Sequence, residues 1–127
     1  MNYLLDTHAV IWMVEDSPKM PGAIKEIIRN SDNHLYICTI SLWEITIKMN
    51  IGKIKLSLTL DELINELKIS DFNFLQVEDK YLLGLSALPL LHRDPFDRLL
   101  ISTAAAENMT IITVDENIQK YDVSWIW

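Results

Sequence analysis

The chain has few of the residues that build disulfide, zinc or phosphate-binding frameworks. It contains one cysteine, which rules out an internal disulfide, and three isolated glycines among 127 residues. The scarcity of glycine excludes a P-loop and the Gly-rich fingerprint of dinucleotide-binding proteins. Cys38 and the histidines His8, His34 and His92 show no paired spacing of the kind that zinc sites use. An EF-hand loop and the nucleophile elbow of serine hydrolases are absent as well.

Long hydrophobic runs are also missing. No apolar stretch approaches the ~18 residues that a membrane span needs. The N-terminus does not match a signal peptide, because it lacks a basic region and Asp6 interrupts its apolar start. We therefore expect a protein of the cytoplasm that makes no membrane contact. Half of the residues are hydrophobic, and the length predicts a single domain over residues 1–127.

Positive charge is scarce, since the formal net charge is −7. An acidic chain is not an obvious nucleic-acid binder, because contacts to phosphate need lysine or arginine. The total charge would mislead, however, if several of the acids were metal ligands. The charge around the site would then decide what binds there.

The hydrophobic pattern alternates between strand-like and helix-like segments. Strands are expected at residues 3–5, 35–39, 72–77, 110–114 and 123–126, and helices at 7–15, 23–30, 41–50, 60–67, 78–88 and 96–108, with a turn or short helix over 115–121 and an extended arm over 53–56. Strands that alternate with helices predict an α/β fold with a parallel sheet covered on both faces.

Four carboxylates stand where a strand-like run gives way to a helix-like or loop-like run: Asp6, Glu44, Asp97 and Asp115. They are far apart in sequence, but an alternating β/α chain brings such points together along one edge of its sheet. Several acids at one edge repel one another, and hard divalent cations such as Mg²⁺ or Mn²⁺ are the usual reason for such clusters. The pattern therefore favours a metal site.

Each acid also has a plain structural explanation. Asp6 and Asp115 could cap the helical turns that follow them. Ser41 and Glu44 match a capping box, in which the glutamate reaches back to the serine N–H. Glu44 could instead pair with Lys48 one turn later.

The same holds for the stretch Asp94-Pro95-Phe96-Asp97. It has a capping Asp94, a proline at the first helical position and an acid, Asp97, in the first turn. Capping explains each acid taken singly, but it does not explain four acids at one edge.

Four motifs lie in order along the chain: Leu5-Asp6-Thr7-His8, Ser41-Leu42-Trp43-Glu44-Ile45, residues 92–100 (HRDPFDRLL) and Ile112-Thr113-Val114-Asp115. Together they resemble the PIN-domain nucleases, and most closely the VapC-like toxins of bacterial and archaeal toxin–antitoxin pairs. The resemblance covers nearly the whole chain. It implies a three-layer α/β/α sandwich around a parallel sheet, an acidic pocket for one or two Mg²⁺ or Mn²⁺ ions, and endoribonuclease activity. It also implies a cognate antitoxin as partner.

Carried over by position, the resemblance assigns the metal ligands and catalytic acids. Asp6, Glu44 and Asp97 match the core acidic triad, and Asp115 matches a fourth acid that varies more within the family. Thr113 matches a polar position near the site. The capping role of Asp94 is at least as well supported as a role in metal binding.

Substrate contacts are expected from residues next to the acids. We assign Thr7 and Thr113 to substrate binding, and Arg93 and Arg98 to clamping phosphate. Alternatively, the two arginines only balance the negative charges of the neighbouring Asp94 and Asp97.

The densest basic stretch of the chain is formed by Lys48, Lys53 and Lys55. It could guide RNA to the site or simply be a solvated face.

The helix expected over residues 41–50 has two apolar stripes, one with Leu42 and Ile45 and another with Trp43 and Ile47. A helix that is apolar on two sides is buried on two sides. The second side would contact a second subunit or an antitoxin peptide, unless both stripes belong to the core. We expect a homodimer.

The leading hypothesis is a metal-dependent endoribonuclease toxin that hydrolyses RNA with a metal-activated water. Such a reaction needs no 2′-hydroxyl, so a nuclease acting on another nucleic acid remains an alternative. The other alternative is a non-catalytic PIN-like binding module in which the acids only cap helices. An aspartyl phosphatase is weaker, because Asp6-Thr7-His8 lacks the second aspartate of such enzymes.

Overall fold

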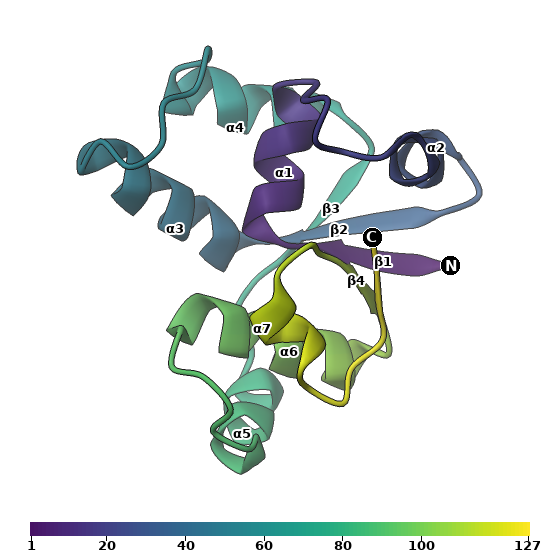
Figure 1. Cartoon of the computed structure of the whole chain (residues 1–127), viewed down its shortest axis with the longest axis vertical. Helices are drawn as coiled ribbons and strands as arrows, with labels where there is room; N and C mark the ends of the chain where they lie inside the picture. The colour runs from purple at the N-terminus through teal and green to yellow at the C-terminus, as the bar shows by residue number, and fades with distance from the viewer.

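A computed structural model describes all 127 residues and has a five-stranded sheet at its centre (Figure 1). The strands are β1 (Asn2–Leu5), β2 (His34–Cys38), β3 (Phe72–Leu75), β4 (Thr110–Ile112) and β5 (Trp125–Ile126). Their order in the sheet is β3-β2-β1-β4-β5, and every neighbouring pair is parallel. The predicted parallel α/β sheet is confirmed, including the short last strand at its edge.

Helices cover both faces of the sheet. They are α1 (Thr7–Val14), α2 (Gly22–Arg29), α3 (Thr39–Asn50), α4 (Leu60–Ile69), α5 (Asp79–Ala87), α6 (Pro95–Glu107) and α7 (Glu116–Gln119). Helices α1 to α4 lie on one side of the strands and α5 to α7 on the other, which completes the predicted α/β/α sandwich (Figure 1). None of these helices combines the length and the apolar character needed to span a bilayer.

The expected extended arm over residues 53–56 is not a strand. It is an irregular connection between α3 and α4. Ile54 and Leu56 pack from this connection against the core, while Lys53 and Lys55 are exposed. The alternation of apolar and polar residues therefore reflects a segment with one buried side and not a strand of the sheet.

The core has two halves, one on each face of the sheet. Leu5 and Ile112 belong to the half under α1 to α4, whereas Leu4 and Ile111 belong to the half under α6. Successive side chains of a strand point to opposite faces, so a strand covered on both sides must be apolar at every position. Cys38 lies in the second half and is fully buried, as expected for a core residue.

The strand order changes direction at one point of the sheet. From β1 the chain steps outward to β2 and β3, and it then returns to add β4 and β5 on the other side of β1. Ligands of open α/β sheets bind at such a switch point, outside the carboxyl ends of the strands. Here the switch point lies between β1 and β4, which Asp6 and Thr113 directly follow.

Helices α5 and α6 approach closely at Gly84, where an added Cβ would lie 2.6 Å from the hydroxyl oxygen of Ser102. That hydroxyl donates to the carbonyl oxygen of Tyr81 and is buried. We expect Gly84→Ala to lower the free energy of unfolding by about 1–3 kcal/mol, because overpacking outweighs the better helix propensity of alanine. Chemical denaturation measures the change.

Gly22 is the matched control, because nothing lies within 4 Å of a Cβ added there. Gly22→Ala should leave stability unchanged or raise it slightly. Removing the hydroxyl with Ser102→Ala leaves only the Ser102 Cβ near residue 84, at 3.8 Å. The Gly84→Ala cost should therefore shrink in the Ser102→Ala background, and an equal cost in both backgrounds would contradict the overpacking argument.

Candidate active site

Asp6 is the residue that joins the two central strands at their carboxyl ends. It follows β1 directly and caps α1, since its Oδ1 accepts from the backbone N–H of Ala9 at 2.7 Å. Its Oδ2 accepts from the hydroxyl of Thr113, the residue after β4. The Thr113 hydroxyl in turn accepts from the backbone N–H of Asp115 at 3.0 Å. A single threonine thus links the acid that follows β1 with the acid that follows β4.

Glu44 reaches the same edge from α3, and the predicted capping box with Ser41 does not form. Strand β2 runs directly into α3, which begins at Thr39, so Ser41 already lies inside the first turn. Glu44 instead accepts from the hydroxyl of Thr7 and forms the expected ion pair with Lys48, at 2.7 Å. The capping-box prediction was wrong because strand β2 ends closer to the helix than the local motif indicates.

Ser41 has an unusual environment next to this acid. Its hydroxyl is buried and has no hydrogen-bond partner in the protein. Thr7 is buried as well, and its hydroxyl is already donated to Glu44. The assignment of Thr7 to substrate binding stays a prediction.

Asp94 and Asp97 lie at the start of α6 and take different roles. Asp94 is the capping residue, because its Oδ1 accepts from the backbone N–H of Asp97 at 2.9 Å, and Pro95 is the first residue of the helix. Asp97 makes no cap. Its Oδ2 lies 3.1 Å from Nε2 of His92, and its side chain is 15% exposed. The interpretation of Asp94 as the N-cap of α6 is confirmed.

Asp115 caps the last helix of the chain. Its Oδ1 accepts from the backbone N–H of Asn117 at 2.8 Å. Its side chain is partly exposed at the carboxyl end of β4. The predicted cap is therefore present at Asp115, as it is at Asp6.

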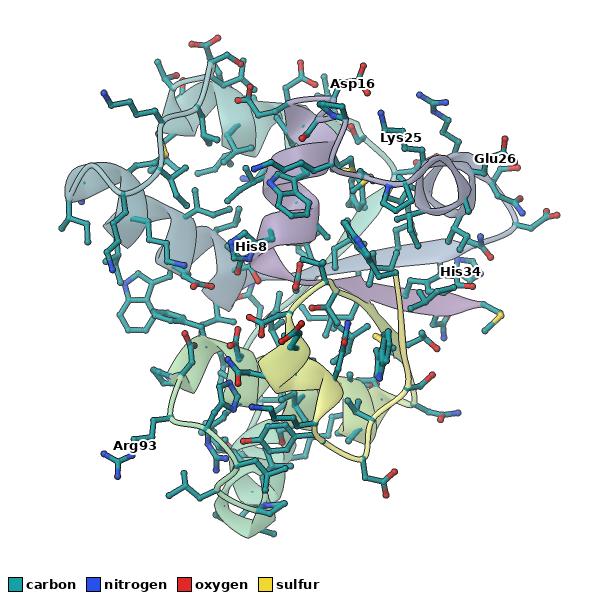
Figure 2. The ribbon with its side chains drawn as sticks, viewed as in Figure 1. His8, Asp16, Lys25, Glu26, His34 and Arg93 are labelled. Carbon is teal, nitrogen blue, oxygen red and sulfur yellow. The ribbon has the colours of Figure 1, made fainter.

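Burial is the main influence on the Asp6 carboxyl and raises its pKa. The hydrogen bonds from Thr113 and Ala9 and the charge of His8 lower the pKa in part. The negative charge of Asp115 raises it further. His8 is exposed at the start of α1 (Figure 2), two positions after this acid in the sequence.

Burial also raises the pKa of Asp97, to about 7. The hydrogen bond from His92 acts against this shift, and the charges of Asp94, Asp115 and Glu44 add to it. Because Asp97 responds to Glu44 and Asp115, and Asp6 responds to Asp115, the four predicted acids form one electrostatic group. The structure thus places Glu44 and Asp115 within electrostatic range of Asp97, and Asp115 within range of Asp6.

A divalent cation suits this group of residues. No three or more Asp, Glu, His or Cys side chains surround a common point closely enough to hold a metal ion directly. Mg²⁺ keeps several water ligands, however, and proteins commonly hold it with one or two carboxylates. The donors are carboxylate oxygens, which this ion prefers. A cation would favour the ionised forms of Asp6 and Asp97, whose pKa values are raised by burial and, to a smaller extent, by neighbouring negative charges.

The two arginines do not balance the charge of the acids. Arg98 donates through Nη1 to the carbonyl oxygen of Pro89 and to the hydroxyl of Tyr121, each at 2.9 Å, and no ion pair joins it to an acid. Arg93 is exposed and extends away from the rest of the molecule (Figure 2). Charge balance for Asp94 and Asp97, the alternative for both arginines, is not observed. Their assignment to phosphate binding stays a prediction.

Sequence reasoning missed the surroundings of His92. The ring of this loop histidine lies between Asp97 and Tyr121 and is largely buried. Nothing near Tyr121 in the sequence indicates this contact, because Tyr121 lies 29 residues from His92. His8, by contrast, stands two positions after Asp6 and could have been found from the motif.

The raised pKa of Asp97 predicts how the stability of the metal-free protein depends on pH. The folded protein binds a proton at this carboxyl more tightly than the unfolded chain does, whose ordinary value is 3.8. The contribution of this carboxyl to stability is therefore greatest at low pH and is lost as the pH rises from about 4 to about 7. Asparagine does not ionise, so Asp97→Asn removes this loss. The free energy of unfolding of the variant, relative to that of the unaltered chain, should therefore increase by roughly 2–4 kcal/mol between pH 4.5 and pH 8.

Urea unfolding in EDTA at both pH values measures this effect. Asp32→Asn is the control, since Asp32 is exposed and makes no side-chain contact to another charged group. A gain from Asp97→Asn that is equal at both pH values would contradict the raised pKa.

Comparison with known proteins supports the resemblance to PIN-domain proteins. A family model for the PIN domain matches residues 3–124. The fold is similar to VapBC2 from Rickettsia felis bound to promoter DNA, with a TM-score of 0.70, 21% identity, and coverage of 99% of this chain and 98% of that chain. It is also similar to VapBC-1 from nontypeable Haemophilus influenzae, with a TM-score of 0.67, 21% identity, and coverage of 99% and 97%.

A third similar structure is FitAcB from Neisseria gonorrhoeae, with a TM-score of 0.66, 18% identity, and coverage of 98% of this chain and 96% of that chain. A search of curated protein sequences gives no match. The resemblance found in the four motifs is confirmed, because the domain model spans almost the full length and the fold agrees with it. The chain belongs to the PIN-domain family, whose members are nucleases.

Proposed function

We propose that the chain is an endoribonuclease that depends on Mg²⁺ or Mn²⁺, and that it is the toxin of a toxin–antitoxin pair acting in the cytoplasm. One observation carries the enzymatic part of the proposal. Acids from four separate segments of the chain lie at the switch point of a parallel sheet, where burial raises the pKa of Asp6 and of Asp97, the charge of Asp115 adds to both shifts, and the charge of Glu44 adds to that of Asp97. A group of like charges in this position is suited to binding a cation and, through it, a phosphodiester.

The residues proposed to hold the cation are Asp6, Glu44, Asp97 and Asp115, through direct contacts and through the water ligands of the ion. When bound, the ion supplies the positive charge that polarises a phosphate oxygen and lowers the pKa of the attacking water. The chain's own residues hold the carboxylates for this purpose. Thr113 and the N-terminus of α1 favour the ionised form of Asp6, and the N-terminus of α6 does so for Asp97.

The reaction would be hydrolysis of a phosphodiester. An oxygen–phosphorus bond forms to the attacking water and the bond to the 3′ oxygen breaks, which leaves a 5′-phosphate. The four acids do not line the cavity of about 540 Å³ that lies among α1, α2 and α4. An open edge suits a polymeric substrate better than a small molecule. Arg93 is the arginine free to contact that substrate, because Arg98 already has three hydrogen-bond acceptors.

A protein partner is proposed on two grounds. The similar structures are VapBC and FitAB complexes, which supports a cognate antitoxin.

The protein also exposes large apolar side chains on α3, on α5 and in the loop before α6: Trp43, Leu82, Leu83, Leu90 and Leu91. Trp43 belongs to the second apolar stripe of α3 and is 60% exposed, so the monomer core does not cover it. We propose that a second copy of the chain does.

The alternative is a non-catalytic binding module in which the acids only cap helices. Asp6, Asp94 and Asp115 do cap helices, which favours it in part. Glu44 and Asp97 cap nothing, yet both are largely withdrawn from solvent. Calorimetric titration with Mn²⁺ separates the two proposals, since a pure capping role predicts no heat of binding.

Asp6→Asn should abolish cleavage of RNA in the presence of Mg²⁺ or Mn²⁺, with the loss reaching at least about 100-fold. The fold should survive, because an asparagine side chain still caps α1 well. Gel analysis of a long RNA measures cleavage, and circular dichroism checks the fold. Asp32→Asn is the matched control for loss of one exposed charge and should keep full activity.

EDTA should stop the reaction and added Mn²⁺ should restore it. Single-stranded DNA tested beside the RNA decides whether the substrate is RNA alone. Full RNA cleavage by Asp6→Asn, or undiminished cleavage in EDTA, would refute the proposed mechanism.

The homodimer is tested by sedimentation equilibrium of the purified chain. We expect a mass of twice 14.7 kDa at micromolar concentration. Trp43→Ser should shift the equilibrium toward the monomer, because the substitution removes apolar area from the proposed contact. Val77→Ser is a control for an exposed apolar residue at another position. A monomer for the unaltered chain would rule the dimer out.

A further inference from the structure

We propose that Tyr121 is a positioning residue that acts through His92 to orient the Asp97 carboxylate. This inference rests on the proposed function, in which Asp97 is a ligand of the cation. Tyr121 follows α7 and is only 4% exposed, and its ring belongs to the same half of the core as Leu100 and Ile118. The ring is therefore held in place by packing, and the hydroxyl is left to make polar contacts.

The Tyr121 hydroxyl has four polar neighbours. The backbone N–H groups of Leu91 and His92 each lie 3.2 Å away, and Nη1 of Arg98 lies 2.9 Å away. The fourth neighbour is Nδ1 of His92, at 2.9 Å. The first three groups can only donate hydrogen bonds. The phenolic proton must therefore go to the one neighbour that can accept it, which is Nδ1 of His92.

This assignment fixes the tautomer of the imidazole. Because Nδ1 accepts from Tyr121, the ring proton resides on Nε2. Nε2 lies 3.1 Å from Oδ2 of Asp97 and donates to it. Oδ1 of Asp97 makes no hydrogen bond and is left available to a cation. Histidines and carboxylates that support metal ligands in this way hold the ligand orientation that binding requires.

The network also joins two segments of the chain. Tyr121 ends the segment that begins at Asp115, whereas His92 and Arg98 belong to the loop and helix that carry Asp97. The Arg98 guanidinium donates to the same hydroxyl, and a positive donor polarises a hydroxyl into a stronger donor. Without the hydroxyl, the His92 ring would lose the partner that fixes its orientation. The segments that carry Asp97 and Asp115 would also lose the hydrogen bonds that connect them.

Tyr121→Phe removes the hydroxyl and keeps the packed ring. Tyr81→Phe is the matched control, because Tyr81 is also buried and loses one hydrogen bond, to Glu107 at the other end of α6. The first measurement is the long-range ¹⁵N–¹H spectrum of the histidine rings, assigned with His92→Gln. We expect the Nε2–H tautomer for His92 in the unaltered chain and in Tyr81→Phe, and a mixture of tautomers in Tyr121→Phe.

The second measurement is Mn²⁺ affinity by calorimetry, together with kcat and KM for RNA. Tyr121→Phe should weaken Mn²⁺ binding by about 10-fold and lower kcat with little change in KM. Tyr81→Phe should change neither. In a His92→Gln background, where glutamine can donate to Asp97 without a hydroxyl partner, Tyr121→Phe should have little further effect.

The outcomes separate this inference from the proposed function. A His92 ring with its proton on Nδ1, or an unchanged tautomer and Mn²⁺ affinity in Tyr121→Phe, would overturn the inference while the unaltered enzyme stays active. An unaltered chain that neither binds Mn²⁺ nor cleaves RNA would overturn the proposed function. The tautomer spectrum needs no metal, so it still decides the Tyr121–His92 contact in that case. If Tyr121→Phe does not fold, His92→Gln and His92→Ala are compared instead. Glutamine can donate to Asp97 and alanine cannot, so His92→Ala should bind Mn²⁺ more weakly than His92→Gln.

Discussion

Burial of carboxylates beside one another at the carboxyl edge of β1 and β4 is the constraint on which the rest of the site depends. Asp6 is 2% exposed, and its burial raises the pKa of its carboxyl. The surrounding groups offset this cost in different ways. Thr113 and the Ala9 N–H donate to Asp6, Lys48 pairs with Glu44, and His92 donates to Asp97. These hydrogen bonds and this ion pair favour the ionised forms of the carboxylates.

Capping and metal binding do not exclude each other at this edge. Asp115 caps α7 through Oδ1 only, so its second oxygen makes no hydrogen bond within the protein. A cap fixes the carboxylate at the start of a helix, where the positive end of the helix dipole also favours its charge. Asp94 shows the other case, because it caps α6 and thereby sets where Asp97 enters the first turn. The caps are therefore part of how the site is positioned.

Much of this arrangement could be predicted from the sequence. Continuous apolar runs identified the strands buried on both faces, and Asp94-Pro95 identified the start of α6. Parallel strands have only one carboxyl edge, which explains why residues distant in sequence could be placed together. Contacts that depend on exact strand ends and on long-range packing could not be predicted. The Ser41 capping box failed for the first reason, and the contacts of Tyr121 with His92 and Arg98 were missed for the second.

The energetics distinguish a functional group of acids from a set of ordinary caps. An N-cap contributes about 1 kcal/mol to a helix, and it does so from an exposed position where the charge stays hydrated. Asp6 and Asp97 are instead withdrawn from water and lie among other acids, which raises the pKa of both. Desolvation and repulsion of this kind destabilise the fold by more free energy than an N-cap contributes to it. A protein that needed only a cap at residue 6 would be more stable with serine or asparagine there, and residue 97, which caps no helix, would need no charge at all. Charge at these positions is opposed by burial and by neighbouring acids, which is the electrostatic situation that the proposed cation would relieve.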